Sequence, residues 1–148
     1  MRTVPELDED GVAFFEHYWQ RVRGDRALPP VSAIDPQAFP RALKTIYLLE
    51  GTTVDTLSVR LAGTFYREVY GREVTGERLI DLVPVNNRPE IYRDYEACLQ
   101  NGQLRYRSGT FDWRRPGAQF PYRRLLMPFG AGAQVERIMG FIEFQVPD

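Results

Sequence analysis

Cysteine and histidine are nearly absent from this chain of 148 residues, which has one of each, Cys98 and His17. A single cysteine excludes an internal disulfide and is typical of proteins kept in a reducing compartment, so we expect a cytoplasmic location. With one histidine, the chain cannot build a two-histidine metal site, and any conventional catalytic triad would depend on His17. We therefore expect no metal ion and no catalytic histidine.

Long apolar runs and a charge excess are missing too. No stretch approaches the 18 or so consecutive apolar residues of a membrane span, and residues 1–11 are acidic, unlike the start of a secretion signal. The formal net charge is −1, which provides no general attraction for nucleic acids. The sequence therefore predicts neither a membrane nor a nucleic acid as partner.

What the chain does have is a hydrophobic content of 43%, with 13% aromatic residues, at a length that suits one domain. We divide it into an N-terminal helix with a connector, residues 1–35, and a core, residues 36–148. In the core, alternating apolar residues and turn residues predict strands at 46–50, 56–62, 104–113, 120–129 and 135–146. Helices are expected at 36–43, twice between 64 and 84, and at 87–100. The predicted class is α+β with a five-stranded antiparallel sheet.

The N-terminal helix is predicted to begin after Asp8 or Asp10 and to run to Arg23, with Gly24 as its stop. It carries an apolar stripe with nearly heptad spacing, formed by Val12, Phe15, Trp19 and Val22. Such a stripe must be buried, either against the protein's own sheet or against a second copy of the helix.

Several short motifs together resemble the PAS domain family. Tyr70-Gly71 ends one short helix, and the pattern Thr75-Gly76-x2-Leu79-x-Asp81-Leu82 follows it, as in the middle of a PAS core. Two motifs upstream of the core are similar to the segment that precedes the core in small, stand-alone bacterial PAS proteins. They are Trp19-x3-Arg23-Gly24-x3-Leu28-Pro29 and Asp35-Pro36. The segments 60–64 and 125–128 extend the resemblance over nearly the whole chain.

This resemblance implies a PAS fold with an extra N-terminal helix and a sensory or signalling role without catalysis. It implies action through an unknown partner protein, control by a small ligand in the core, and a homodimer paired through the N-terminal helix. Six aromatic residues fall on elements that surround the cavity of PAS domains, and the alternative is that they simply fill the core. These candidate ligand-binding residues are Tyr66, Tyr70, Tyr92, Tyr95, Phe111 and Tyr122.

Neither haem nor flavin is expected as a cofactor. Haem-binding PAS domains typically place a histidine on or near the long helix, and the helix predicted at 87–100 has none. Flavin photosensors of the family carry a cysteine within Asn-Cys-Arg-Phe-Leu-Gln, a string that this chain lacks. Cys98 is therefore predicted to be a packing residue, with a thiol sensor as the minor alternative.

Arginines are concentrated on two neighbouring predicted strands and their loop. Arg123 and Arg124 must point to opposite faces of the sheet, so one of them is expected inside, where it needs a carboxylate from the protein or from a ligand. The outward arginines form either a solvated face or a docking surface. Arg60 is predicted to pair with an acid of the neighbouring strand. The clustered residues are Arg105, Arg107, Arg114, Arg115, Arg123 and Arg124.

Two other functions stay open at this point. A small enzyme of the ketosteroid isomerase kind has a similar length and a curved sheet, and it would need a buried acid or base such as Asp112 beside Tyr122. The other alternative is a structural adaptor with a filled core and an obligate dimer.

Overall fold

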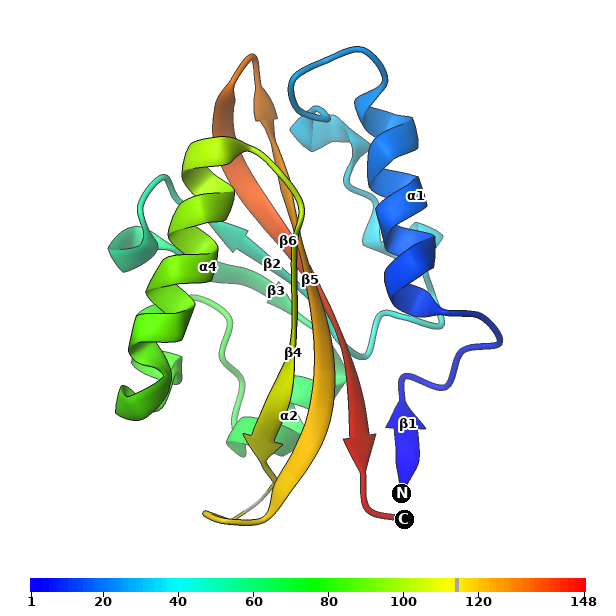
Figure 1. Ribbon diagram of the computed structural model, residues 1–148, viewed down its shortest axis with the longest axis vertical. Helices are drawn as coiled ribbons and strands as arrows, with labels where there is room; N and C mark the ends of the chain where they lie inside the picture. Colours follow the sequence, from blue (N-terminus) through cyan, green and yellow to red (C-terminus); the bar gives the residue numbers. More distant parts are fainter. Residues whose placement is uncertain (114) are drawn as a thin grey trace.

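The computed structural model describes residues 1–113 and 115–148, which form one antiparallel sheet with helices on both faces (Figure 1). The strands follow the spatial order β3-β2-β6-β5-β4, and β1 pairs with β6 beside this series. The strands are β1 Arg2–Val4, β2 Ile46–Glu50, β3 Ser58–Ala62, β4 Arg105–Asp112, β5 Gln119–Ala131 and β6 Gln134–Val146. The α-helices are α1 Gly11–Arg23, α2 Thr64–Tyr70, α3 Leu79–Leu82 and α4 Arg88–Asn101. The predicted α+β class and its five core strands are confirmed.

Two differences from the expected elements concern short segments. The helix predicted at 36–43 is only a 3-10 turn, Pro36–Ala38, followed by further turns. Strand β1 was not predicted, because three residues are too few to show the alternation of a strand. It exists because β6 is long: residues 144–146 extend past the part that pairs with β2, and β1 pairs with them. The two chain ends therefore lie side by side (Figure 1).

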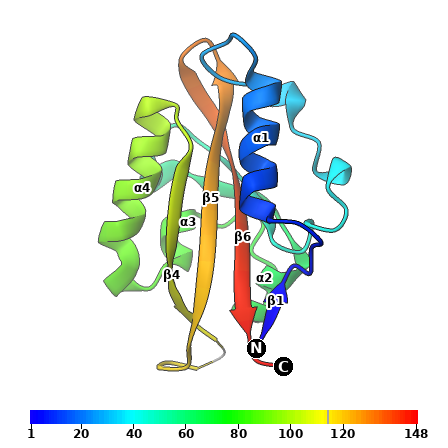
Figure 2. The ribbon, with the colours of Figure 1, turned by 45° about the vertical axis from the view of Figure 1, so that its right-hand side comes forward.

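Helix α1 begins and ends where its sequence predicts. The Asp10 carboxylate accepts hydrogen bonds from the backbone N–H groups of Val12 and Ala13, and Gly24 ends the helix with a φ of 58°. These contacts satisfy N–H groups that have no partner within the helix. The helix lies on one face of the sheet and α4 lies on the other (Figures 1 and 2).

The apolar stripe of α1 is buried against the protein's own sheet. Val12, Phe15 and Trp19 are 8% exposed or less, and the half-buried Val22 also packs against the core. The Phe15 ring lies 4.8 Å from that of Phe141 on β6, centre to centre, and Trp19 Nε1 donates to the Pro128 carbonyl at 2.7 Å. The expectation that these residues form a dimer interface is therefore corrected, since the sheet already covers them.

The alternation of side chains along β5 and β6 decides which residues face which helix. Leu125 is paired with Phe141, and both lie on the face covered by α1, whereas the neighbouring pair Arg124 and Ile142 lies on the opposite face. That opposite face, beneath α4, α2 and α3, holds a hollow of about 420 Å³.

Two glycines fix the position of α2 under this face. A Cβ atom on Gly63 would lie 2.2 Å from the carbonyl oxygens of Leu43 and Lys44, so only glycine permits this close approach. Gly71 ends α2 with a φ of 72°, the left-handed cap that the sequence predicts. As a result, the Tyr66 hydroxyl donates to the Thr45 carbonyl at 2.6 Å.

Candidate ligand-binding cleft

A cleft of about 420 Å³ opens between α4, α2 and the inner face of β4, β5 and β6, and we call it the outer cleft. Behind it lies a smaller space of about 140 Å³, the inner cavity, lined also by β2 and β3. Both share Arg124, Tyr66 and Ile142 as walls. The rim of the outer cleft is exposed, whereas Arg124 at its depth is 4% exposed. The two spaces therefore lead from solvent to a buried guanidinium group.

Five of the six predicted aromatic residues line these spaces. Tyr66, Tyr70, Phe111 and Tyr122 line the outer cleft, and Tyr95 lines the inner cavity. Tyr92 is the exception and corrects the prediction, because its hydroxyl donates to Asp55 on the other side of α4. It follows the inward-facing Ile91 by one residue, which turns it by about 100° around the helix.

Asp94 on α4 is the centre of the charge network beneath the cleft. Its carboxylate, 3% exposed, accepts from Arg124 Nη2 at 2.5 Å and from Arg107 Nη2 at 2.9 Å, with Arg105 at 3.5 Å. These arginines come from β4 and β5, so Asp94 ties α4 to the sheet. The prediction that an inward arginine meets a carboxylate is confirmed, but sequence reasoning did not identify Asp94.

Both central groups are charged. Burial raises the pKa of Asp94, but the hydrogen bond from Arg107 and the charge of Arg124 outweigh it, so the net pKa lies below its usual value. Burial acts to lower the pKa of Arg124, yet the surrounding tyrosines and Asp94 keep it above the usual value. The Arg124 guanidinium also lies over the Tyr95 ring, 5.4 Å from its centre.

The tyrosines, most of them buried, add neutral polar groups to these walls. The hydroxyls of Tyr47 and Tyr95 lie 2.5 Å apart, and Tyr122 donates to Glu90 at 3.4 Å. Burial raises the pKa of Tyr47 and Tyr66 well above its usual value, so these phenols stay protonated. They can orient a ligand by hydrogen bonding but cannot act as bases near neutral pH.

One strong donor of a wall residue is unused. The N–H of Arg124 at Nε is buried and has no hydrogen-bond partner within residues 1–113 and 115–148. A buried donor without a partner costs about 1–3 kcal/mol, so a ligand that accepts from it gains a favourable contact.

Cys98 is fully buried on α4 and does not line either space, which confirms the packing role predicted for it. Burial raises the pKa of its thiol to about 12. We predict that native protein reacts with Ellman's reagent at neutral pH at least about 100-fold more slowly than denatured protein, because little thiolate is accessible. Fast release of one equivalent from native protein would contradict this burial.

The remaining sequence candidates lie elsewhere. Arg60 pairs with Glu50 of the neighbouring strand at 3.0 Å, as predicted. Arg123 lies on the face opposite Arg124 and pairs with Glu143 at 2.9 Å. Arg114 lies outside the described residues. Asp112 is exposed at the rim of the outer cleft, so it does not provide the buried acid or base that isomerase chemistry needs.

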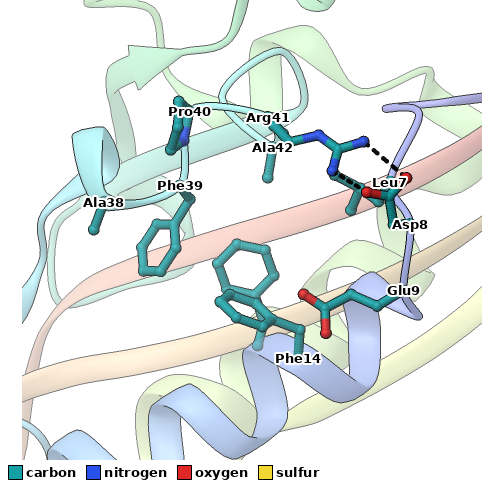
Figure 3. A pocket seen from close by; sticks show the side chains of 10 residues that line it. Leu7, Asp8, Glu9, Phe14, Ala38, Phe39, Pro40, Arg41 and Ala42 are labelled. Atoms are coloured by element: carbon teal, nitrogen blue, oxygen red, sulfur yellow. Dashed lines mark hydrogen bonds and ion pairs between the residues drawn. The ribbon is translucent and has the colours of Figure 1, made fainter.

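A second hollow, of about 240 Å³, lies on the opposite face between α1 and residues 38–42 (Figure 3). Phe14 and Phe39 form its apolar walls, and Arg41 pairs with Asp8 at 2.6 Å along its edge. Both charged partners are largely exposed, and neither Asp8 nor Arg41 has a buried polar atom without a partner. The outer cleft is therefore the better candidate for a binding site.

Within the described residues there is no group of three or more potential metal-ligating side chains of His, Cys, Asp and Glu. The same part of the chain has no helix long and apolar enough to cross a membrane.

Comparison with known proteins identifies similar folds. A family model described as a PAS domain matches residues 8–143. A light-oxygen-voltage domain studied with a flavin analogue is 16% identical, with a TM-score of 0.57 over 76% of this chain and 84% of that one. A PAS domain from Colwellia psychrerythraea is 12% identical, with a TM-score of 0.54 over 74% and 95% of the two chains. A domain of a putative light and redox sensing histidine kinase from Haloarcula marismortui is 16% identical, with a TM-score of 0.53 over 74% and 97%. No curated protein matches the sequence.

Proposed function

Because the chain belongs to the PAS domain family, whose members are typically sensory modules, we propose that it binds a small molecule in the outer cleft and signals to a partner protein. The single observation that carries this proposal is the cleft itself, which leads from an exposed rim to the buried Arg124. A cleft of about 420 Å³ falls in the range of small-molecule sites, about 300–1,000 Å³. We propose a cytoplasmic location on the ground of the single cysteine.

The proposal includes the absence of catalysis and of a haem or flavin cofactor. In support, the phenols of the cleft are held protonated by burial, and Asp94 is occupied by three arginines. Cys98 lies outside the walls of both spaces, where a thiol could not reach a bound ring. The helix α4 has no histidine to bind an iron atom.

The structural adaptor is the second candidate, and the open volume of the outer cleft argues against its filled core. The decisive experiment is a native mass spectrum of protein purified without added ligands, followed by a denaturing spectrum of the same sample. We expect an excess mass that disappears on denaturation. A clean mass of the bare chain, with no partner recovered in a cross-linking pull-down, would contradict the proposed function.

A further inference from the structure

We propose that the ligand of the outer cleft is a small monocarboxylate with a flat apolar body, whose carboxylate accepts from Arg124 while the body packs between aromatic side chains. This inference rests on the proposed function and specifies the chemistry of its ligand. Four properties of the cleft carry it: an unused buried donor, the local charge, the position of the acids, and the apolar walls.

The first property is the unused donor at Arg124. The residue is 4% exposed, lines both spaces, and directs Nη2 to Asp94 while Nε has no partner in the described residues. A guanidinium group presents its N–H donors as a fixed fork, which matches the two oxygens of a carboxylate better than a single neutral acceptor. Because Nε itself is buried, a ligand carboxylate would reach it only with a small shift of the Arg124 side chain, and it would then satisfy Nε while Nη2 stays on Asp94.

The second property is the charge of the network around Asp94, in which Asp94 and Arg124 are buried and the other three groups are partly exposed. Arg105, Arg107 and Arg124 carry three positive charges, and Asp94 and Glu90 carry two negative ones, because these five groups are joined by ion pairs of 3.5 Å or less. The formal sum, 3 − 2, is +1. One ligand carboxylate brings the network to neutrality, whereas a cationic head group would raise its charge further.

The third property is the position of the acids on the wall. Glu90 and Asp112 both line the outer cleft, and they are the groups that would repel an anion. Glu90 is compensated by Arg107 at 3.1 Å, and Asp112 is exposed at the rim, where water screens it. The inner cavity has Arg124 as its one charged wall residue among those described. The field therefore favours a carboxylate at the depth of the cleft over one at its mouth.

The fourth property is the shape and chemistry of the walls. Around the approach to Arg124 the outer cleft is lined by Phe111, Phe144, Tyr66 and Ile142. Aromatic walls favour a flat ring or a short chain, which buries apolar surface at about 25 cal/mol per Å². A single carboxylate is favoured over a dicarboxylate, because Arg124 is the one cationic side chain among the described wall residues of the two spaces.

The proposal is tested with three matched probes on the full chain: phenylacetate, phenylacetamide and phenethylamine. Binding is measured by isothermal calorimetry and by the shift of the melting temperature at fixed probe concentration. We expect phenylacetate to bind and the neutral amide to bind about 10- to 100-fold more weakly, because a hydrogen bond to a charged group is stronger than one to a neutral group. The amine is expected not to bind.

Two variants locate the contact. Arg124→Lys keeps the charge but removes the Nε donor and the paired N–H donors of the guanidinium group. It should weaken the binding of phenylacetate at least about tenfold. Arg123→Lys, on the opposite face, is the matched control and should leave the affinity unchanged. Since Arg124→Lys can also weaken the fold, the comparison of the three probes on unmodified protein stands without it.

Equal binding of phenylacetate and phenylacetamide, or preference for the amine, would overturn the inference while leaving a ligand cleft in place. Failure of all three probes would also overturn it. In that case the native mass spectrum separates the two proposals: an excess mass on purified protein keeps the proposed function, and a bare mass with no partner ends both.

Discussion

Replacing Asp94 by alanine is expected to lower the free energy of unfolding by about 3–5 kcal/mol, because it leaves Arg124 as a buried cation without its carboxylate. Asp94 is 3% exposed and accepts from arginines on both β4 and β5. The loss is measured as a decrease in the urea concentration at the midpoint of unfolding.

Asp81→Ala is the matched control, since Asp81 also pairs with an arginine, Arg78, at 3.1 Å, but at the surface. Exposed pairs of this kind contribute at most about 1 kcal/mol, so this variant should unfold almost like the unmodified protein. If Asp94→Ala costs no more than Asp81→Ala, the charge network does not hold α4 to the sheet.

The same network makes stability depend on pH in a defined direction. The pKa of Asp94 in the folded state lies below its ordinary value of 3.8. A carboxyl group with a lowered folded-state pKa stabilises the fold fully above the unfolded value and loses this contribution as the pH falls through the folded value. We therefore compare the free energies of unfolding of the unmodified protein and of Asp94→Asn. Their difference is expected to be constant near neutral pH and to shrink below about pH 4.

Local features of the fold could be predicted because their causes are local. The cap at Asp10, the stop at Gly71 and the pair between Arg60 and Glu50 depend on residues close in sequence or on adjacent strands. Strand alternation likewise required one of Arg123 and Arg124 to lie inside. The identity of its carboxylate was not predictable, because it depends on where α4 crosses the sheet and how the helix is rotated about its axis.

The rotation of α4 also explains why Tyr95 lines one of the two spaces and Tyr92 does not. The sequence places Tyr92 and Tyr95 on the same helix but does not show which way each side chain points. In the structure the Tyr92 hydroxyl donates to Asp55, away from the cleft, whereas the hydroxyl of Tyr95 lies 2.5 Å from that of Tyr47. The partner of the apolar stripe on α1 was equally undetermined, since spacing alone does not distinguish a sheet from a second helix.

The second large effect is expected from Trp19→Ala, which should lower the free energy of unfolding by about 3–5 kcal/mol. Trp19 is 1% exposed, and its indole N–H donates to the Pro128 carbonyl on β5 at 2.7 Å. The substitution removes the side chain that fills the space between α1 and the sheet, and it leaves that carbonyl without its donor. Unfolding followed by circular dichroism at several protein concentrations measures the effect.

The concentration series separates the two uses of α1. If the stripe served to pair two copies, the midpoint of unfolding of the unmodified protein would rise with protein concentration, and Trp19→Ala would remove that dependence. Since the sheet of the same chain covers Trp19, we expect the midpoint of unfolding to be independent of protein concentration in the unmodified protein and in Trp19→Ala. The loss of unfolding free energy in the variant would then come entirely from contacts within one molecule. His17→Ala, an exposed position on the same helix, should change the stability by less than about 0.5 kcal/mol. If Trp19→Ala also lowered the free energy of unfolding by less than about 0.5 kcal/mol, α1 would not be part of the core. Its apolar stripe would then be free to pair with a second copy of the chain.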